Sequence, residues 1–70
     1  MLTLTRMEYR LLALLVEHAG EIVPRPTLLM LTPTMDVHLW RLRKKLGRYA
    51  DHYIETVPEV GYRFRPAPGP

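Results

Sequence analysis

No cysteine occurs among the 70 residues of the sequence. Disulfide frameworks and thiolate sites are thereby excluded, and nothing indicates an oxidising compartment. Long apolar runs are absent too. The longest, Leu11–Val16, is far too short to span a bilayer, and the first ten residues include an acidic side chain and lack the apolar core of a signal peptide. We therefore expect a soluble, cytoplasmic protein.

Glycine is scarce, with four residues, and none of them belongs to a glycine-rich phosphate loop. No nucleophile stands in a pattern with a paired base, and the acidic residues are scattered along the chain. The histidines, His18, His38 and His52, lack the paired spacing of zinc ligands. The sequence thus indicates a protein without catalysis, metal or cofactor, and favours a binding function.

The charge of the chain is positive and unevenly placed. Residues 1–36 carry three arginines against four acidic residues, a net charge of −1, whereas residues 37–70 carry seven cations against three acidic residues, a net charge of +4. A basic half on a small domain suggests a polyanionic partner, with nucleic acid first and anionic lipid second. The alternative is a solvated helix face that is kept charged for solubility.

The first helix is marked at both ends. Thr5 and Glu8 have the spacing of a capping box, in which the two side chains satisfy each other's backbone N–H groups, so the helix begins near Arg6. Gly20 supplies a residue of the kind that commonly ends a helix. Between these ends, helical spacing relates Leu11, Leu12, Leu15 and His18.

The second helix is expected to be short. Pro24 and Pro26 are tolerated only at the entry of a helix, because proline lacks the N–H that an interior position donates. At most about a turn and a half can therefore follow. That turn and a half contains Leu28, Leu29 and Leu31.

The third helix is predicted from about Pro33 to Leu46. Thr32 can cap it, Pro33 suits its first position, and Gly47 closes it. Asp36 in the first turn faces the positive end of the helix dipole. The predicted core side consists of Met35, Leu39, Leu42 and Leu46. The opposite side consists of Val37, Arg41, Lys44 and Arg48, flanked by Trp40 and Lys45.

Apolar residues within a cationic face call for an explanation. An α-helix fits the major groove of B-DNA, where cations reach phosphates or guanine edges and an apolar group can touch a thymine methyl. That interpretation accounts for Val37 and Trp40. Two other interpretations remain open: Val37 is an incidentally exposed residue, or Trp40 packs over the neighbouring hairpin.

The segment 53–65, YIETVPEVGYRFR, predicts a hairpin of two short strands. The turn contains Pro58, Glu59 and Gly61. Tyr62 and Phe64 alternate with Arg63 and Arg65, so one face can pack while the other meets solvent or phosphate. Residues 66–70 hold nothing to bury and are expected to be a disordered tail. The fold class is therefore mainly α with a small β-hairpin.

The order of these motifs resembles a known family. "LTRMEYRLLALLVEHAGEIV", "MDVHLWRLRKKLG" and "IETVPEVGYRF" are similar to the first helix, the recognition helix and the C-terminal wing of the OmpR/PhoB-type winged-helix DNA-binding domain. The resemblance implies a winged helix-turn-helix of three helices plus a wing over residues 1–65. It also implies a transcriptional regulator that binds double-stranded DNA, with the recognition helix in the major groove and the wing over the adjacent minor groove. In this family the domain usually follows the receiver domain of a two-component response regulator.

The resemblance also assigns roles by matching position. Thr34, Arg41 and Arg43 would approach phosphates, Val37 and Trp40 would face base edges, Thr56 and Tyr62 would lie on the wing side, and Asp36 and His38 would help to orient the helix. The cations that complete the candidate DNA-binding set are Lys44, Lys45, Arg48 and Arg63.

Departures from the family pattern are equally specific. Pro58 and Glu59 stand where the family places an arginine followed by glycine, and Glu59 would be repelled by phosphate, so readout of the minor groove by the wing tip is not expected. The family commonly has a polar residue or arginine at Trp40. The chain between Leu29 and Asp36 is shorter than usual, and because activators of this family meet RNA polymerase there, a direct polymerase contact is not expected.

Only MLTL corresponds to the small sheet that precedes the first helix in the family. An uncovered first helix would invite self-association, so we expect a homodimer. Whether the sequence is a complete protein or one domain of a longer protein stays open. The alternative function is a winged-helix protein-interaction module with little affinity for DNA, which the exposed tryptophan and the altered wing tip favour.

Overall fold

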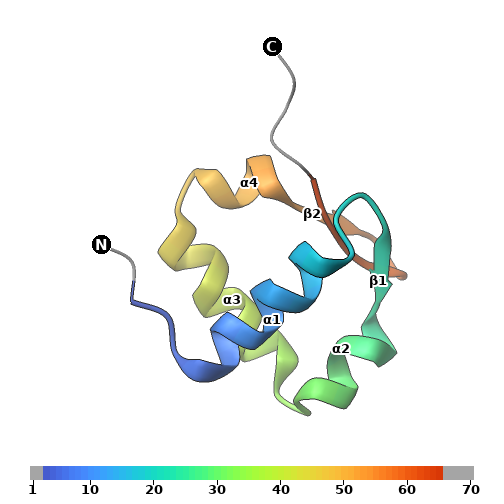
Figure 1. The fold of residues 1–70 in the computed structure, drawn as a ribbon, viewed down its shortest axis with the longest axis horizontal. Coiled ribbons are helices and arrows are strands. Elements are labelled where there is room, and N and C mark those ends of the chain that lie inside the picture. Colours follow the sequence, from blue (N-terminus) through green and yellow to red (C-terminus); the bar gives the residue numbers. More distant parts are fainter. Residues whose placement is uncertain (1–2, 66–70) are drawn as a thin grey trace.

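A computed structural model describes residues 3–65 of the chain. Its elements are α1 (Arg6–Glu17), β1 (Ile22–Pro24), α2 (Arg25–Leu31), α3 (Met35–Leu46), α4 (Tyr49–Tyr53), β2 (Ile54–Val57) and β3 (Gly61–Phe64). Figure 1 shows α1 and α3 in the middle of the molecule, with α2 and the strands toward one side. Residues 66–70, for which we predict disorder, lie outside the described residues.

The capping box predicted for the first helix is confirmed. Glu8 N–H donates to Thr5 Oγ1 at 3.2 Å, and Thr5 N–H donates to Glu8 Oε1 at 2.9 Å, so α1 begins at Arg6. The helix ends at Glu17, and the chain leaves it through Gly20, whose φ of +87° suits a residue without a side chain. The N–H of Gly20 donates to the carbonyl of Phe64 at 2.8 Å, which ties the end of α1 to β3.

The third helix begins two residues later than predicted. Thr34, not Thr32, is the N-cap of α3, and Met35 is the first helical residue. Thr32 is buried in an extended conformation after the last residue of α2, which is the conformation that the following Pro33 favours. Its hydroxyl accepts a hydrogen bond from Thr34 N–H at 3.3 Å. Thr32 therefore helps to shape the short connection between α2 and α3, and α3 begins after Thr34.

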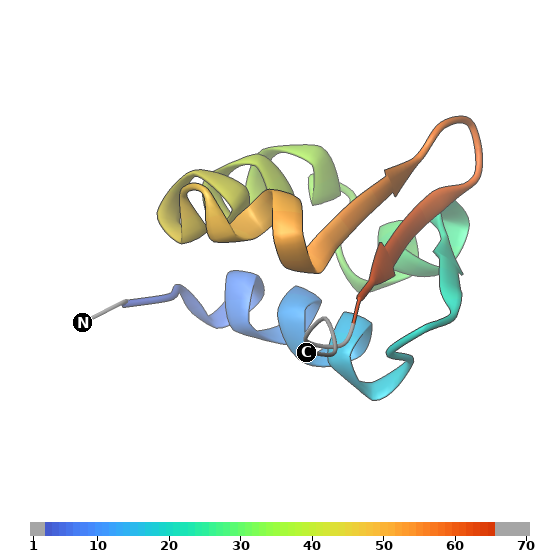
Figure 2. The same ribbon diagram turned by 90° about the horizontal axis from the view of Figure 1, so that it is seen from above.

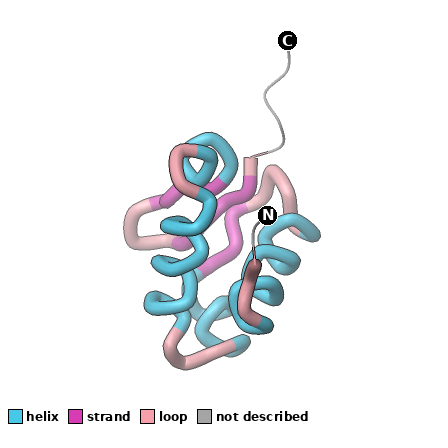
Figure 3. The backbone as a smooth tube through the Cα atoms, turned by 90° about the vertical axis from the view of Figure 1, so that its left-hand side faces the viewer, coloured by secondary structure: helices cyan, strands magenta, loops and turns pink. Residues whose placement is uncertain are grey.

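The sheet has three strands instead of the predicted two. All pairings are antiparallel and the order is β1-β3-β2, with Val23 opposite Tyr62 and Thr56 opposite Tyr62 on the other side. Figure 3 shows the three strands side by side, with helices on both sides of them in this view. The prediction missed β1 because it is an edge strand of three residues that ends in Pro24. Proline is tolerated at a sheet edge, and no local pattern announces the pairing.

A short helix, α4, also lies where no helix is predicted. It follows Gly47, which ends α3 with a positive φ of 61°, and it leads directly into β2. Among its five residues only Ala50 is buried. An amphipathic stripe is therefore missing, and hydrophobic periodicity gives no signal for such a short element.

The hydrophobic core lies between α1, α3 and the sheet, and α1 packs against both α3 and β3. Figure 2 shows α3 lying over α1, with the β2–β3 hairpin projecting at one end of the molecule. The buried core consists of Leu11, Leu15, Val23, Leu28, Met35, Leu39, Leu42 and Ile54. No helix within residues 3–65 has the length and apolar character needed to cross a lipid bilayer.

Candidate nucleic-acid interface

Helix α3 has one buried side and one exposed side. Met35, Leu39 and Leu42 are buried in the core, as the helical spacing predicts. Val37 lies three and four residues before Trp40 and Arg41, and Lys44 lies four and three residues after them. These four exposed residues therefore share the other side of the helix, which we call the outer face. Val37 is 47% exposed and Trp40 is 60% exposed. Trp40 is therefore not a core residue of the hairpin.

The cations near α3 fall into two groups, which the sequence does not distinguish. In the first group each cation forms an ion pair with a carboxylate: Arg25 with Asp36, Arg43 with Asp51, Lys45 with Glu8 and Arg63 with Glu55. By contrast, no carboxylate within residues 3–65 forms an ion pair with Arg41, Lys44 or Arg48. Because exposed cations without a protein partner are the ones free to meet phosphate, Arg41 and Lys44 make the outer face electropositive.

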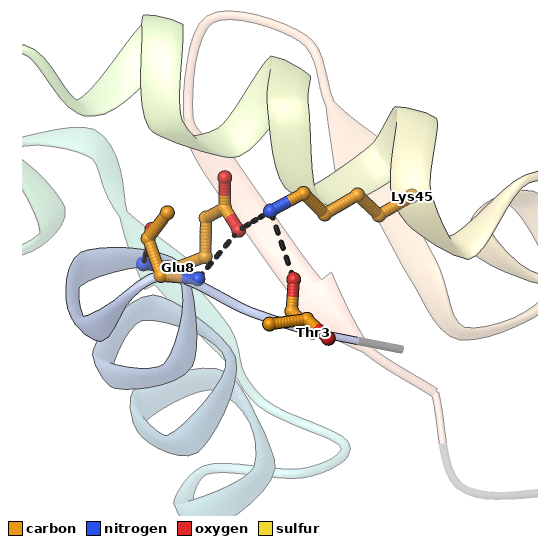
Figure 4. Close-up of polar contacts among 4 residues, drawn as sticks. Thr3, Glu8 and Lys45 are labelled. Carbon is orange, nitrogen blue, oxygen red and sulfur yellow. Dashed lines mark hydrogen bonds and ion pairs between the residues drawn. The ribbon is translucent and has the colours of Figure 1, made fainter. Parts of the chain in front are cut away.

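The side chain of Lys45 extends toward α1 and not over the outer face. Its Nζ lies 2.6 Å from Glu8 Oε1 and donates to the carbonyl oxygen of Thr3 at 3.0 Å, as Figure 4 shows. Glu8 is fully buried. Burial by itself raises the pKa of Glu8, but the Lys45 ammonium and the hydrogen bonds from Thr5 outweigh it and lower the pKa below its ordinary value. This pair joins the first turn of α1 to the last turn of α3.

Arg25 holds the opposite end of α3. Its Nη1 and Nη2 donate to the two carboxylate oxygens of Asp36, each at 3.1 Å. These hydrogen bonds and the charge of Asp36 raise the pKa of Arg25 above its ordinary value. Such a two-point pair between α2 and the first turn of α3 restricts the angle between the two helices.

A groove of about 230 Å³ separates α3 from the hairpin. It is lined by Asp36, Leu39, Trp40, Arg43, Thr56 and Tyr62. Arg43 closes one side of it, because its Nη1 donates to Thr56 Oγ1 at 3.1 Å and its Nη2 lies 3.3 Å from Asp51 Oδ1. Arg43 thus links α3 to both the wing and α4.

Three other candidate residues, Thr34, His38 and Arg48, do not line the groove. Thr34 is exposed at the start of α3, and its hydroxyl lies 3.2 Å from that of Thr32. The ring of His38 is partly covered, and its buried Nδ1 has no hydrogen-bond partner within the described residues. Arg48 lies beyond the end of α3, where helical spacing no longer sets its direction, and its guanidinium is 6.0 Å from the ring of Tyr49.

Arg63 lies on the sheet and is held there. It stands opposite Glu55 in the β2–β3 register, with Nη2 at 2.6 Å and Nε at 3.0 Å from Glu55 Oε1. Because side chains alternate along a strand, Arg63 points to the sheet face opposite to that of Tyr62. The two residues are therefore on different faces, and only Tyr62 lines the groove.

The wing tip carries a backbone constraint. Val60 N–H donates to the Val57 carbonyl at 3.1 Å, which closes a four-residue turn. Pro58 and Glu59 occupy its central positions, and Glu59 has a φ of +66°. A positive φ at the third residue is characteristic of a type II turn, where glycine is normally found. The negative charge of Glu59 is thus placed at a position that also strains its backbone.

Arg25 and Asp51 also hold this region together, and neither is among the candidate residues predicted from the sequence. Each acts through a partner on another element, Asp36 for Arg25 and Arg43 for Asp51. No pattern along the chain signals such a pairing.

Comparison with known proteins agrees with this geometry. A family model described as "Transcriptional regulatory protein, C terminal" matches residues 1–64. The transcriptional regulatory protein HprR of Escherichia coli K12 is 38% identical over 90% of this chain and 33% of its own length. The phosphate regulon transcriptional regulatory protein PhoB of Pseudomonas aeruginosa is 38% identical over 81% of this chain and 29% of its own.

The transcriptional activator protein PfeR of Pseudomonas aeruginosa is 41% identical over 84% of this chain. The alignments cover between 23% and 33% of the length of these three relatives. The resemblance stated from the sequence, with its winged-helix fold, is thereby confirmed. The chain belongs to the family of C-terminal domains of transcriptional regulatory proteins, the OmpR/PhoB-type winged-helix domains, and is a DNA-binding, non-enzymatic regulator domain.

Proposed function

We propose that this domain binds double-stranded promoter DNA with the outer face of α3 in the major groove. Arg41 and Lys44 contact phosphates or guanine edges, and Val37 and Trp40 face the bases. The observation that carries the proposal is the two-sided character of α3: its buried residues hold the helix in the core, and the cations of its outer face, Arg41 and Lys44, have no carboxylate partner within residues 3–65.

The groove between α3 and the hairpin fits the sugar-phosphate backbone at the edge of the major groove. Thr56 and Tyr62 offer hydroxyl groups along it. Arg43 acts mainly by holding the wing against α3, because Thr56 and Asp51 already engage its guanidinium. Thr34 and Arg48 extend the contact at the two ends of the helix. Lys45 and Arg63 are left out of the proposed surface, since each is engaged by a glutamate.

The test measures affinity for a fluorescein-labelled duplex of random sequence by anisotropy at a series of salt concentrations. Because each phosphate contact releases counterions, log K falls with log salt with a slope of about −0.9 per contact. The double variant Arg41→Ala/Lys44→Ala should therefore bind every duplex more weakly and lose between about 0.9 and about 1.8 from the slope, the values of one and two phosphate contacts.

A matched control removes the same charge from another element. Arg6 and Arg10 are exposed on α1, so Arg6→Ala/Arg10→Ala lowers the net charge equally but should leave the slope nearly unchanged. Equal losses in the two double variants would show that net charge alone drives binding. A wild-type domain that binds no duplex at low salt would instead support the alternative function, a protein-interaction module.

Three further features of the proposal concern partners and place. Tyr9 and Val16 are exposed on α1, and we propose that this apolar surface supports homodimers, which sedimentation at high concentration would reveal. The connection between α2 and α3 is only residues 32–34, so we propose no direct RNA polymerase contact there. A promoter-binding domain acts where the chromosome lies, and the cytoplasm is the proposed compartment.

A further inference from the structure

The exposed indole of Trp40 is paired with a cation. The Nζ of Lys44 lies 4.7 Å from the centre of the Trp40 ring, one helical turn along α3. Attraction between the ammonium and the electron-rich ring face holds the two side chains together. Trp40 nevertheless stays 60% exposed, on the outer face and at the edge of the groove. The pair therefore presents an apolar surface directly beside a hydrogen-bond donor.

This combination matches one base edge in the major groove. Thymine carries its C5-methyl group next to the O4 acceptor, whereas guanine offers acceptors without a methyl group and cytosine offers an amino donor. An indole can cover the methyl while the adjacent ammonium donates to O4. The other three bases satisfy at most one of the two groups.

The carboxylate that lines the groove beside Trp40 is paired with a cation. Asp36 lines the same groove as Trp40, and a free carboxylate there would accept a hydrogen bond from the cytosine amino group. Arg25 donates a hydrogen bond of 3.1 Å to each oxygen of Asp36, and its positive charge compensates that of the carboxylate. On the same side of α3, Trp40 and Lys44 contribute an apolar ring and a donor.

We infer that Trp40 is a specificity-determining residue that selects thymine, with Lys44 as the donor to O4. The inference rests on the proposed placement of α3 in the major groove. It names the base that Trp40 recognises at one position of the DNA site. The family pattern does not supply this base, because the family commonly has a polar residue or arginine where this chain has Trp40.

The experiment starts from a duplex that the wild-type domain selects from a random library. Each thymine of the selected site is replaced in turn by deoxyuridine, which keeps O4 and lacks only the methyl group. At one position we expect the Kd to rise about fourfold, the value of one buried methyl-sized group. Replacing that T·A pair by 5-methylcytosine·guanine keeps the methyl and exchanges O4 for an amino group, and it should also weaken binding.

The variants assign the effect to residues. Trp40→Ala should bind the thymine and deoxyuridine duplexes equally, whereas Met30→Ala, a control that shortens an exposed apolar side chain on α2, should keep the difference. Lys44→Met should keep sensitivity to the methyl but no longer distinguish thymine from 5-methylcytosine. Circular dichroism verifies that each variant is folded, which the exposure of the substituted side chains favours.

A spectroscopic measurement reports the contact directly. Trp40 is the only tryptophan of the chain, so its fluorescence is free of other indoles. Bromine in 5-bromodeoxyuridine takes the place of the methyl and should quench this fluorescence at the same position. Normal, salt-dependent binding with no thymine preference, or a preference that survives Trp40→Ala, would overturn the inference and leave the proposed function standing. Absence of binding to any duplex would remove the proposed function itself.

Discussion

Lys44 and Lys45 are neighbours in the chain, yet their ammonium groups serve different surfaces of α3. Lys44 Nζ lies over the exposed ring of Trp40, at 4.7 Å from its centre, whereas Lys45 Nζ lies 2.6 Å from the buried carboxylate of Glu8. An advance of about 100° per residue around the helix is enough to separate them. One lysine is thus available to DNA, and the other joins α3 to α1.

Replacing each lysine by methionine should separate these roles in DNA binding. Lys44→Met is expected to weaken binding and to reduce the salt slope, because a cation that releases counterions is removed from the DNA surface. Lys45→Met removes the same charge but should leave the slope close to that of the wild type, measured under conditions where the variant is folded. Equal salt slopes for the two variants would contradict the assignment of Lys44 to the DNA surface and of Lys45 to the contact with α1.

The free energy of unfolding should fall more in Lys45→Met than in Lys44→Met. Lys45→Met leaves Glu8 buried without its cation, and we expect a loss of about 2 kcal/mol in the free energy of unfolding. This loss is smaller than for a fully buried pair because the Lys45 side chain is 36% exposed. The double variant Glu8→Gln/Lys45→Met should recover part of it, since no charge then remains buried. Urea unfolding at pH 7 measures both, and Lys44→Met should stay within about 0.5 kcal/mol of the wild type.

The same pair predicts a pH dependence of folding. The pKa of Glu8 is lowered in the folded domain relative to its ordinary value of 4.5, so the ionised carboxylate stabilises the fold. This contribution is complete above pH 4.5 and is lost as the pH falls through the lower pKa of the folded state. The free energy of unfolding should therefore fall below that pH more steeply in the wild type than in Glu8→Gln. Parallel pH profiles of the free energy of unfolding in the wild type and in Glu8→Gln would contradict the assignment of this pH dependence to Glu8.

Glu59 at the wing tip allows charge and strain to be tested separately. Glu59→Gly should stabilise the domain by about 0.5 to 1 kcal/mol, because relief of a positive φ exceeds the entropy cost of glycine. It should also bind DNA more tightly, since a negative charge near phosphate is removed. Glu59→Gln keeps the φ of +66° and removes only the charge, so it should improve DNA binding with little change in stability. A gain in stability for Glu59→Gln would contradict the strain argument.

Gly61 is the position at which the sheet tolerates no side chain. A Cβ there would collide with the carbonyl oxygen of Val23 and lie 2.9 Å from Pro24 Cα. Gly61→Ala should therefore separate β1 from β3 and cost at least about 2 kcal/mol in the free energy of unfolding. The neighbouring exposed Val60 is the control, and Val60→Ala should cost less than about 0.5 kcal/mol. Thermal unfolding and the amide NMR shifts of Ile22 and Val23 measure the effect.

Local signals in the sequence predicted much of the helical frame. The capping box of Thr5 and Glu8 places the start of α1, the prolines place the start of α2, and the spacing of Met35, Leu39 and Leu42 identifies the buried side of α3. These features depend on residues within a few positions of one another. The sequence therefore also sufficed for the winged-helix resemblance, because the family's motifs are themselves continuous segments.

The tertiary structure alone decided which cations remain available and how the wing is joined. Lys45 and Arg63 belong to the same positive half of the chain as Arg41, but their carboxylate partners come from α1 and β2. The strand β1 likewise exists only because β3 pairs with it from far along the chain. Ion-pair partners and paired strands that are distant in sequence come together only when the chain folds. The sequence alone therefore does not predict which carboxylate will lie within a few ångströms of a given cation.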